Sequence, residues 1–193
     1  MRLARSFFEQ KTLTVAKNLL GCFLIRQIGQ KKIIARIIET EAYCGPYDLA
    51  SHASKGRTKR TEVMFGPAGY AYVYLVYGMY YCLNVVTGRV GYPAAVLIRG
   101  IELIHGLKFS NFKLPKQTTN NKLRTTKIIG PGKVCRALTI DKRFNDIDLI
   151  KGNRLYIVRV ADDFNRRTVK KLPRVGVDYA RKYKDKKWRF VLE

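Results

Sequence analysis

Two glutamates stand two positions apart in a segment that predicts a β-strand. The segment, Ile33–Tyr43, is apolar and rich in β-branched residues, and a Gly-Pro turn follows it. Because side chains alternate along a strand, one face is expected to carry Ile37, Glu39, Glu41 and Tyr43. Two carboxylates about 7 Å apart repel each other unless a cation or solvent lies between them. Carboxylates can stabilise positive charge or accept a proton from water.

A pair of solvated carboxylates on an open sheet face is the usual alternative for two glutamates on a strand. Here Tyr43 and His52 lie close by in the sequence, and the chain is rich in arginine. These neighbours favour a functional site over a solvated face.

An arginine interrupts a second buried-strand pattern, Ala94–Ile101. Arg99 needs an acidic or phosphate partner if this strand is buried, and Glu39 or Glu41 could supply it. A structural ion pair and a functional one both fit this pattern.

A tyrosine-rich segment, Gly69–Val86, predicts a β-hairpin with its tip at or near residues 77–79. Tyr70, Tyr72 and Tyr74 fall on one side of its first strand. Core packing and β-propensity account for some of the tyrosines. Tyr77 and Met79 are poorly placed for a core, and an exposed apolar tip is typical of a wedge that enters stacked bases.

The elements expected around these residues follow from hydrophobic periodicity and turn signals. We expect a helix at Thr12–Leu20 and a first hairpin strand at Cys22–Arg26. Further along the chain, the pattern predicts a surface loop at Ser51–Thr61, an irregular or mobile loop at Lys108–Lys127, a short helix at Val134–Ile140 and a strand at Leu155–Val160.

The chain is strongly basic, with 38 Lys and Arg against 14 Asp and Glu, a net charge of +24 over 193 residues. This charge favours a polyanionic partner, with nucleic acid first and an anionic membrane surface second. No apolar run approaches the roughly 20 residues that cross a bilayer, and the first residues lack a signal-peptide pattern. We therefore expect a cytoplasmic protein with one domain spanning residues 1–193.

Two segments are candidates for contact with nucleic-acid phosphates. Gly130–Lys133 precedes the short helix, and Lys133 beside a glycine-flanked helix start predicts a phosphate contact, although the tetrapeptide alone is a weak signal. Arg166–Arg189 holds eleven basic residues interleaved with aromatics. A solvated face is the usual meaning of such a run, but its density favours one wall of a nucleic-acid groove.

The four cysteines are scattered, with no CxxC pair and only two histidines in the chain. This spacing argues against a structural zinc site, so the cysteines are interpreted as small core residues and the protein as metal-free. A zinc deaminase that acts on nucleic-acid bases is a further class to consider, but it needs HxE and PCxxC motifs that the sequence lacks.

Five blocks in order resemble the alkyladenine (3-methyladenine) DNA glycosylase family. They are ETEAY with the following GP and His52, MFGPAGYAYVYLVYGMYYCLNVV, AAVLIRGIE, GPGKVCRAL and PRVGV. The ordered set spans most of the chain. The resemblance implies an α+β fold: a single mixed domain with a curved antiparallel sheet, short flanking helices and a protruding hairpin. It also implies removal of damaged purines from double-stranded DNA by base flipping, the first step of base excision repair, without a cofactor.

The resemblance implies a role for each matching position. Glu41 corresponds to the general base that activates water, and Arg99 and the Val175 carbonyl to groups that hold that water. The implied base-pocket residues are Tyr43, His52, Tyr74 and Asn84, the last excluding guanine through its amino group. Tyr77 corresponds to the side chain that fills the gap in the duplex. We expect Arg99 to keep Glu41 ionised at neutral pH.

A non-catalytic basic nucleic-acid-binding protein is the alternative, since it explains the charge and the basic C-terminal segment equally well. It does not explain two carboxylates beside Tyr43 and His52, because carboxylates repel phosphate. The sequence leaves open which lesions are preferred, among 3-methyladenine, 7-methylguanine, hypoxanthine and ethenoadenine. A monomer is the default expectation.

Overall fold

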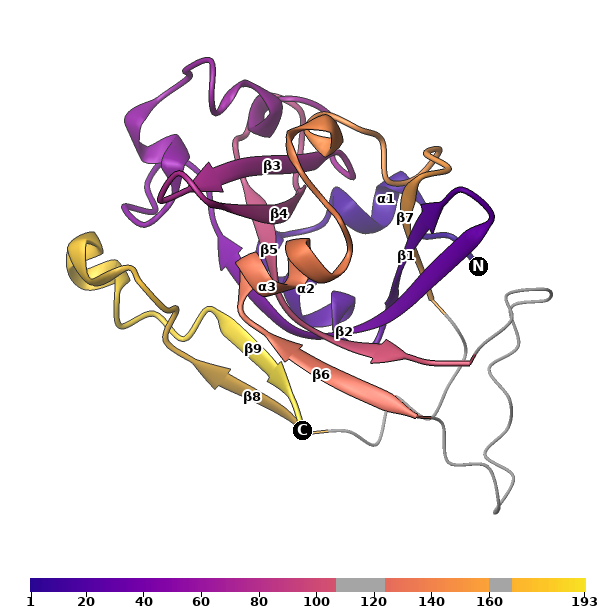
Figure 1. The fold of residues 1–193 in the computed structure, drawn as a ribbon. Helices are drawn as coiled ribbons and strands as arrows, with labels where there is room; N and C mark the ends of the chain where they lie inside the picture. Colours follow the sequence, from indigo (N-terminus) through magenta and orange to yellow (C-terminus); the bar gives the residue numbers. More distant parts are fainter. Residues whose placement is uncertain (107–123, 160–167) are drawn as a thin grey trace.

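The computed structural model describes residues 1–106, 124–159 and 168–193. Within these residues the body of the protein is a nine-stranded sheet whose neighbouring strands all run antiparallel (Figure 1). The sheet is strongly curved and carries a few short helices. The predicted α+β class with a curved antiparallel sheet is confirmed.

The strands are β1 Phe23–Ile28, β2 Lys31–Tyr43, β3 Ala71–Val76, β4 Tyr80–Val86, β5 Ala95–Ile104, β6 Thr125–Ile129, β7 Leu155–Val158, β8 Val169–Leu172 and β9 Arg189–Leu192. The α-helices are α1 Arg5–Phe8, α2 Thr12–Leu19 and α3 Pro131–Ala137. The 3-10 helices are η1 His52–Lys55, η2 Glu62–Phe65, η3 Lys142–Phe144 and η5 Asp178–Tyr183. The part of the chain that the structure describes contains no helix long and apolar enough to cross a membrane.

The two longest strands, β2 and β5, pair with each other and change their outer partners about halfway along. β2 pairs with β1 through residues 31–36 and with β9 at residues 39–41. β5 pairs with β4 at residues 95–97 and with β6 at residues 100–104. The register between β2 and β5 shifts at residues 37–40, in the same place. The sheet therefore branches where the two glutamates and Arg99 lie.

This register shift changes which side chains share a face of β2. Ile37 and Ala42 both lie in the main core, although an uninterrupted strand would point them to opposite faces. Thr40 Oγ1 donates to the Ala16 carbonyl of α2 at 2.8 Å, which ties the core face of β2 to that helix. The expected common face holds for Glu39, Glu41 and Tyr43, but it is wrong for Ile37.

Two segments expected as loops contain regular structure. The predicted loop at Lys108–Lys127 lies largely outside the described residues, but its end forms β6, which pairs with β5. The predicted surface loop at Ser51–Thr61 contains η1, and Ser51, Ala53 and Thr61 are buried. The short polar helix η1 has no apolar periodicity, so its burial depends on packing that the local sequence does not reveal.

The predicted helix at Val134–Ile140 begins three residues earlier, at Pro131, and ends at Ala137. Proline fits the first turn of a helix because its missing N–H would be unpaired there anyway. The strand predicted from Leu155 is present as β7. The predicted hairpin at Gly69–Val86 is confirmed as β3 and β4.

Candidate active site

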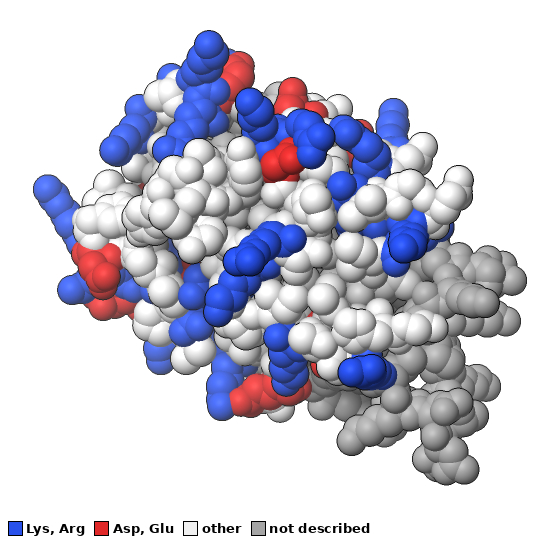
Figure 2. All heavy atoms as spheres, in the orientation of Figure 1, with Lys and Arg blue, Asp and Glu red and all other residues white. Residues whose placement is uncertain are grey.

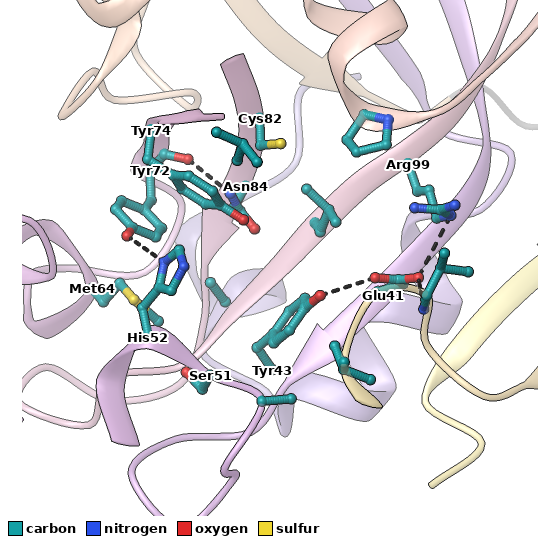
Figure 3. Close-up of a pocket in the computed structure, with 18 of the residues that line it drawn as sticks. Glu41, Tyr43, Ser51, His52, Met64, Tyr72, Tyr74, Cys82, Asn84 and Arg99 are labelled. Carbon is teal, nitrogen blue, oxygen red and sulfur yellow. Dashed lines mark hydrogen bonds and ion pairs between the residues drawn. The ribbon is translucent and has the colours of Figure 1, made fainter. Parts of the chain in front are cut away.

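A cavity of about 510 Å³ opens beside the branch point of the sheet. Its wall includes side chains from β2 and β5, from the β3–β4 hairpin, from η1 and from the segment at residues 175–177. Figure 3 shows Tyr43, Glu41 and Arg99 on one side, and His52 and Tyr74 on the other. Glu41 lines this cavity, whereas Glu39, two residues earlier on β2, does not.

Glu41 is fully buried in the cavity wall, and its carboxylate contacts three donors. Oε1 accepts a hydrogen bond from the Val175 N–H at 3.0 Å and lies 3.5 Å from Arg99 Nε. Oε2 accepts one from the Tyr43 hydroxyl at 3.0 Å. A carboxylate has about four lone-pair positions, so Oε2 can accept one more hydrogen bond. The resemblance implied a role for the Val175 carbonyl, whereas the contact with Glu41 is made by the N–H.

Arg99 contacts both glutamates, which confirms its predicted acidic partners. Its Nε donates to Glu39 Oε1 at 3.0 Å. Arg189 Nη1 donates to the same Glu39 oxygen at 2.9 Å. Glu39 therefore binds two guanidinium groups, those of Arg99 and Arg189. Of these two, Arg99 is the one that also contacts Glu41.

The pKa of Glu41 is raised above its ordinary value, because burial disfavours the charged carboxylate. The charge of Arg99 and the hydrogen bonds from Val175 and Tyr43 lower this pKa, while the charge of Glu39 raises it. Arg99 thus acts in the expected direction, but burial outweighs it. The ionisation of Glu41 at neutral pH stays a prediction.

Aromatic side chains from η1 and β3 form the opposite wall. His52 Nδ1 lies 2.9 Å from the Tyr72 hydroxyl. The His52 and Tyr74 rings meet edge to face, with centroids 4.5 Å apart. Burial, and after it the charges of Arg60 and Lys55, lower the pKa of His52 to about 4. His52 is therefore neutral at neutral pH.

Asn84 lies on β4 opposite Tyr72 and is buried in the cavity wall. Its Nδ2 donates to the Tyr72 carbonyl at 3.1 Å. This bond fixes the orientation of the amide in the cavity wall.

The tip of the β3–β4 hairpin is exposed and apolar, as predicted. Tyr77 is 87 % exposed and Met79 is 65 % exposed. Tyr77 has a positive φ of 52°, which is uncommon outside glycine, and Gly78 beside it has a φ of 70°. Tyr77 also lines the cavity, so the tip stands at its mouth.

Lys133 is exposed on α3 and does not line the cavity, although Pro131 of the same helix does. Lysine and arginine side chains are spread over the face shown in Figure 2, with acidic groups in smaller clusters. The basic segment at Arg166–Arg189 is not a uniform groove wall, because Arg174 is buried and Arg189 pairs with Glu39. Its residues 166 and 167 lie outside the described part.

Sequence reasoning missed several residues of this site. Tyr72 could have been found from the alternation that placed it with Tyr74. Arg60 lies on a polar loop and reaches the cavity, with its guanidinium carbon 5.0 Å from the Tyr74 ring centroid. Asp48 and Arg174, described below, carried no local signal of burial. In the described ranges no cluster of His, Cys, Asp or Glu could hold a metal ion.

A buried carboxylate facing an aromatic-walled cavity, on a strongly basic protein, is typical of enzymes that take a nucleobase out of the helix. The chain belongs to the methylpurine-DNA glycosylase (MPG) family, whose model matches residues 6–193. It is therefore a DNA glycosylase, an enzyme that hydrolyses N-glycosyl bonds in DNA, and the resemblance stated above is confirmed.

Relatives match along almost the whole chain. One from Methanocella arvoryzae is 46% identical over 97% of this chain and 90% of its own length. One from Legionella pneumophila is 45% identical over 100% of this chain and 94% of its own. A third, from Desulfitobacterium hafniense, is 45% identical over 100% of this chain and 95% of its own. All three are named as candidate 3-methyladenine DNA glycosylases.

Proposed function

We propose that this enzyme excises 3-methyladenine from double-stranded DNA, using a water molecule activated by Glu41, and so starts base excision repair. The names of the relatives support the substrate. The observation that carries the mechanism is the buried Glu41 carboxylate in the cavity wall, with two hydrogen-bond donors and Arg99 against it. The enzyme acts as a monomer with one domain of residues 1–193, on DNA in the cytoplasm.

The reaction balances with water as the only co-reactant. The bond between C1′ and the base nitrogen breaks, and its electron pair leaves with the base. Positive charge develops on the sugar, and the Glu41 carboxylate stabilises it. The water oxygen bonds to C1′, and its proton passes to Glu41 Oε2, which among the described residues accepts a hydrogen bond only from the Tyr43 hydroxyl. A general base of this kind contributes about 10²–10⁴ in rate.

The aromatic wall favours a damaged base. A purine such as 3-methyladenine or 7-methylguanine carries positive charge and leaves without an acid. Contact with Tyr43 and Tyr74 would attract such a cation by about 0.5–2 kcal/mol, an attraction that a neutral normal base lacks. Damaged bases also unstack at lower cost. Asn84 would hinder guanine by steric contact with its amino group, which 7-methylguanine shares, so 7-methylguanine would be a poorer substrate than 3-methyladenine.

Neutral lesions would depend on His52 or on a water molecule. Hypoxanthine and ethenoadenine carry no fixed charge, so their departure requires a proton or a hydrogen bond. Because the pKa of His52 is lowered to about 4, it would act as a neutral hydrogen-bond donor rather than as an acid. These two lesions and 7-methylguanine are further candidate substrates after 3-methyladenine.

The apolar hairpin tip and the basic surface would hold the bent duplex. Tyr77 and Met79 would enter the stack where the base leaves it. Lys133 would contact a phosphate beside the cavity.

A non-catalytic binding protein is disfavoured by the family, and one experiment tests the proposal directly. Duplexes holding one defined lesion each are incubated with the protein, and abasic sites are then cleaved with alkali. We expect cleavage at 3-methyladenine. No cleavage at any alkylated purine would refute the proposal. A covalent enzyme–DNA adduct trapped with borohydride would show that the nucleophile is a lysine rather than water. None of the residues that line the cavity in the described part is a lysine.

A further inference from the structure

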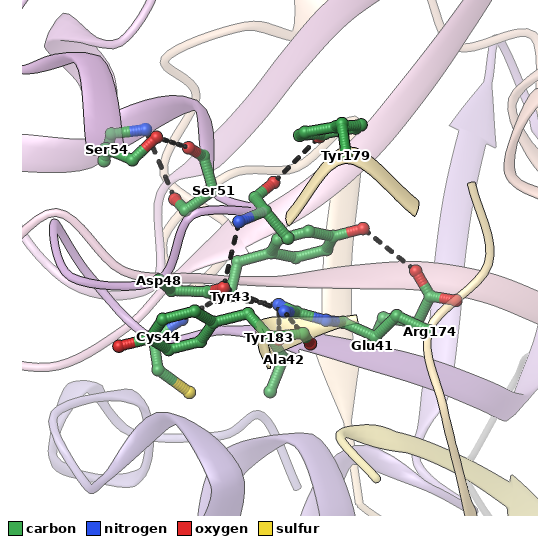
Figure 4. Close-up of polar contacts among 12 residues, drawn as sticks. Glu41, Ala42, Tyr43, Cys44, Asp48, Ser51, Ser54, Arg174, Tyr179 and Tyr183 are labelled. Atoms are coloured by element: carbon green, nitrogen blue, oxygen red, sulfur yellow. Dashed lines mark hydrogen bonds and ion pairs between the residues drawn. The ribbon is translucent and has the colours of Figure 1, made fainter. Parts of the chain in front are cut away.

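Asp48 and Arg174 form a buried ion pair next to the cavity (Figure 4). Arg174 Nη1 lies 2.6 Å from Asp48 Oδ2, and Nη2 lies 2.8 Å from Oδ1. Both side chains are at most 1% exposed. Asp48 also accepts hydrogen bonds from the Cys44 and Ala50 N–H groups, at 3.0 and 3.1 Å. The pair therefore joins the loop after β2 to the segment after β8.

Arg174 is fixed by further contacts on both sides. Nη1 also donates to the Ala42 carbonyl at 2.8 Å, and Nη2 to the Tyr183 carbonyl at 3.3 Å. The guanidinium carbon lies 4.8 Å from the ring centroid of Tyr43 and 5.0 Å from that of Trp188. The guanidinium group thus contacts two aromatic rings.

Stability alone explains this arrangement poorly. A buried ion pair gains little over well-packed apolar residues, because both charges must leave water. In addition, Arg174 Nε is buried and has no hydrogen-bond partner in the described part of the chain. An unpaired buried donor costs about 1–3 kcal/mol.

The two neighbours of this pair are the two hydrogen-bond donors to Glu41. Val175 follows Arg174 directly, and its N–H donates to Oε1. Tyr43, whose ring packs on the Arg174 guanidinium, donates its hydroxyl to Oε2. We propose that Asp48 and Arg174 are positioning residues that hold both donors against Glu41. This inference rests on the proposed role of Glu41 as the general base.

If the inference is correct, loss of this ion pair changes the pKa of Glu41, which can be measured. Both hydrogen bonds lower the pKa of Glu41, so losing them raises that pKa further. A variant that only weakened the fold would lower the amount of active enzyme without moving its pH profile.

The test uses the double variant Asp48→Asn with Arg174→Gln, which removes both charges and leaves neither unpaired. The matched control is Arg5→Gln with Asp148→Asn, which removes a 2.7 Å ion pair away from the cavity. We expect the first variant to lose about tenfold or more in kcat with KM nearly unchanged, and the acid limb of kcat to move to higher pH. Amide hydrogen exchange of Val175 should also accelerate. The control should keep kcat, KM, the acid limb of kcat and the Val175 exchange rate at the wild-type values.

Arg174→Lys serves as a second variant if the double one does not fold. It keeps the charge opposite Asp48 but loses the two-pronged contact, so smaller changes in the same direction are expected. Unchanged Val175 exchange in the folded variants overturns the inference. Faster exchange confined to Val175 and its immediate neighbours, with an unmoved pH profile, still supports positioning and counts instead against Glu41 as the base; faster exchange throughout the fold with an unmoved pH profile shows a structural role and overturns the inference.

Discussion

Arg99 lies closer to Glu39 than to Glu41, with its Nε 3.0 Å from one carboxylate and 3.5 Å from the other. Arg99, which would stabilise the ionised form of Glu41, therefore makes its shorter contact with the neighbouring Glu39. Glu39 also adds its own negative charge, which raises the pKa of Glu41. The pair of glutamates predicted from the strand thus has unequal members: Glu39 binds the arginines, and Glu41 faces the cavity.

Substitution Glu39→Gln should lower the pKa of Glu41, because it removes a negative charge and frees Arg99 for Glu41. The acid limb of the pH profile of the base-release rate in the enzyme–DNA complex should then move to lower pH, since Glu41 acts when deprotonated. Single-turnover base release between pH 4 and 8 measures this. Glu102→Gln is the control, because Glu102 pairs with Arg36 on the sheet. A limb that moves to higher pH would contradict the assignment.

Substitution Glu41→Gln should abolish base release while the protein still binds damaged DNA. The amide keeps the shape of the side chain but cannot take a proton, so we expect a loss of about 10²–10⁴ or more. Alkali cleavage of a lesion duplex measures release, and fluorescence anisotropy measures binding. Full activity of this variant would remove Glu41 from the mechanism.

Substitution Tyr77→Ser should weaken flipping without affecting the fold. The side chain is largely exposed, so the free energy of unfolding should change by less than about 0.5 kcal/mol. Stopped-flow fluorescence of 2-aminopurine beside the lesion measures flipping. Tyr47→Ser is a matched control, since Tyr47 is 78 % exposed and does not line the cavity. Equal signals from wild type and Tyr77→Ser would argue against the wedge.

Substitution Arg60→Gln should raise the pKa of His52 from about 4, because a nearby positive charge disfavours imidazolium. Burial is the larger cause, so the pKa should stay below the ordinary value of 6.5. NMR titration of the imidazole protons measures the shift, and only His105 must be distinguished from His52. Lys59→Gln, next in the chain and outside the cavity lining, should leave it unchanged. An unchanged pKa of His52 in Arg60→Gln would show that the charge of Arg60 does not affect this histidine.

Patterns of neighbouring residues predicted those parts of the fold and site that depend on short stretches of sequence. The tyrosine alternation gave the hairpin, and a charged residue inside an apolar strand identified Arg99 and its acidic partners. The register shift at residues 37–40 was not predictable, because strand periodicity does not reveal an extra residue between partners. Arg174 was assigned to a basic surface, since only a partner 126 positions away makes it a buried residue. Strand β6 is short and largely polar, so its pairing with β5 is what defines it.

The chain contains a single tryptophan, and it stacks on the arginine that precedes Val175. The Trp188 carbonyl also accepts a hydrogen bond from the Ala42 N–H, at 2.9 Å, directly between Glu41 and Tyr43. Emission excited at the red edge of indole absorption therefore comes from one place in the molecule, at the back of the site. The enzyme has an intrinsic, label-free optical reporter, and intensity recorded while damaged DNA binds would follow movement of that segment in real time.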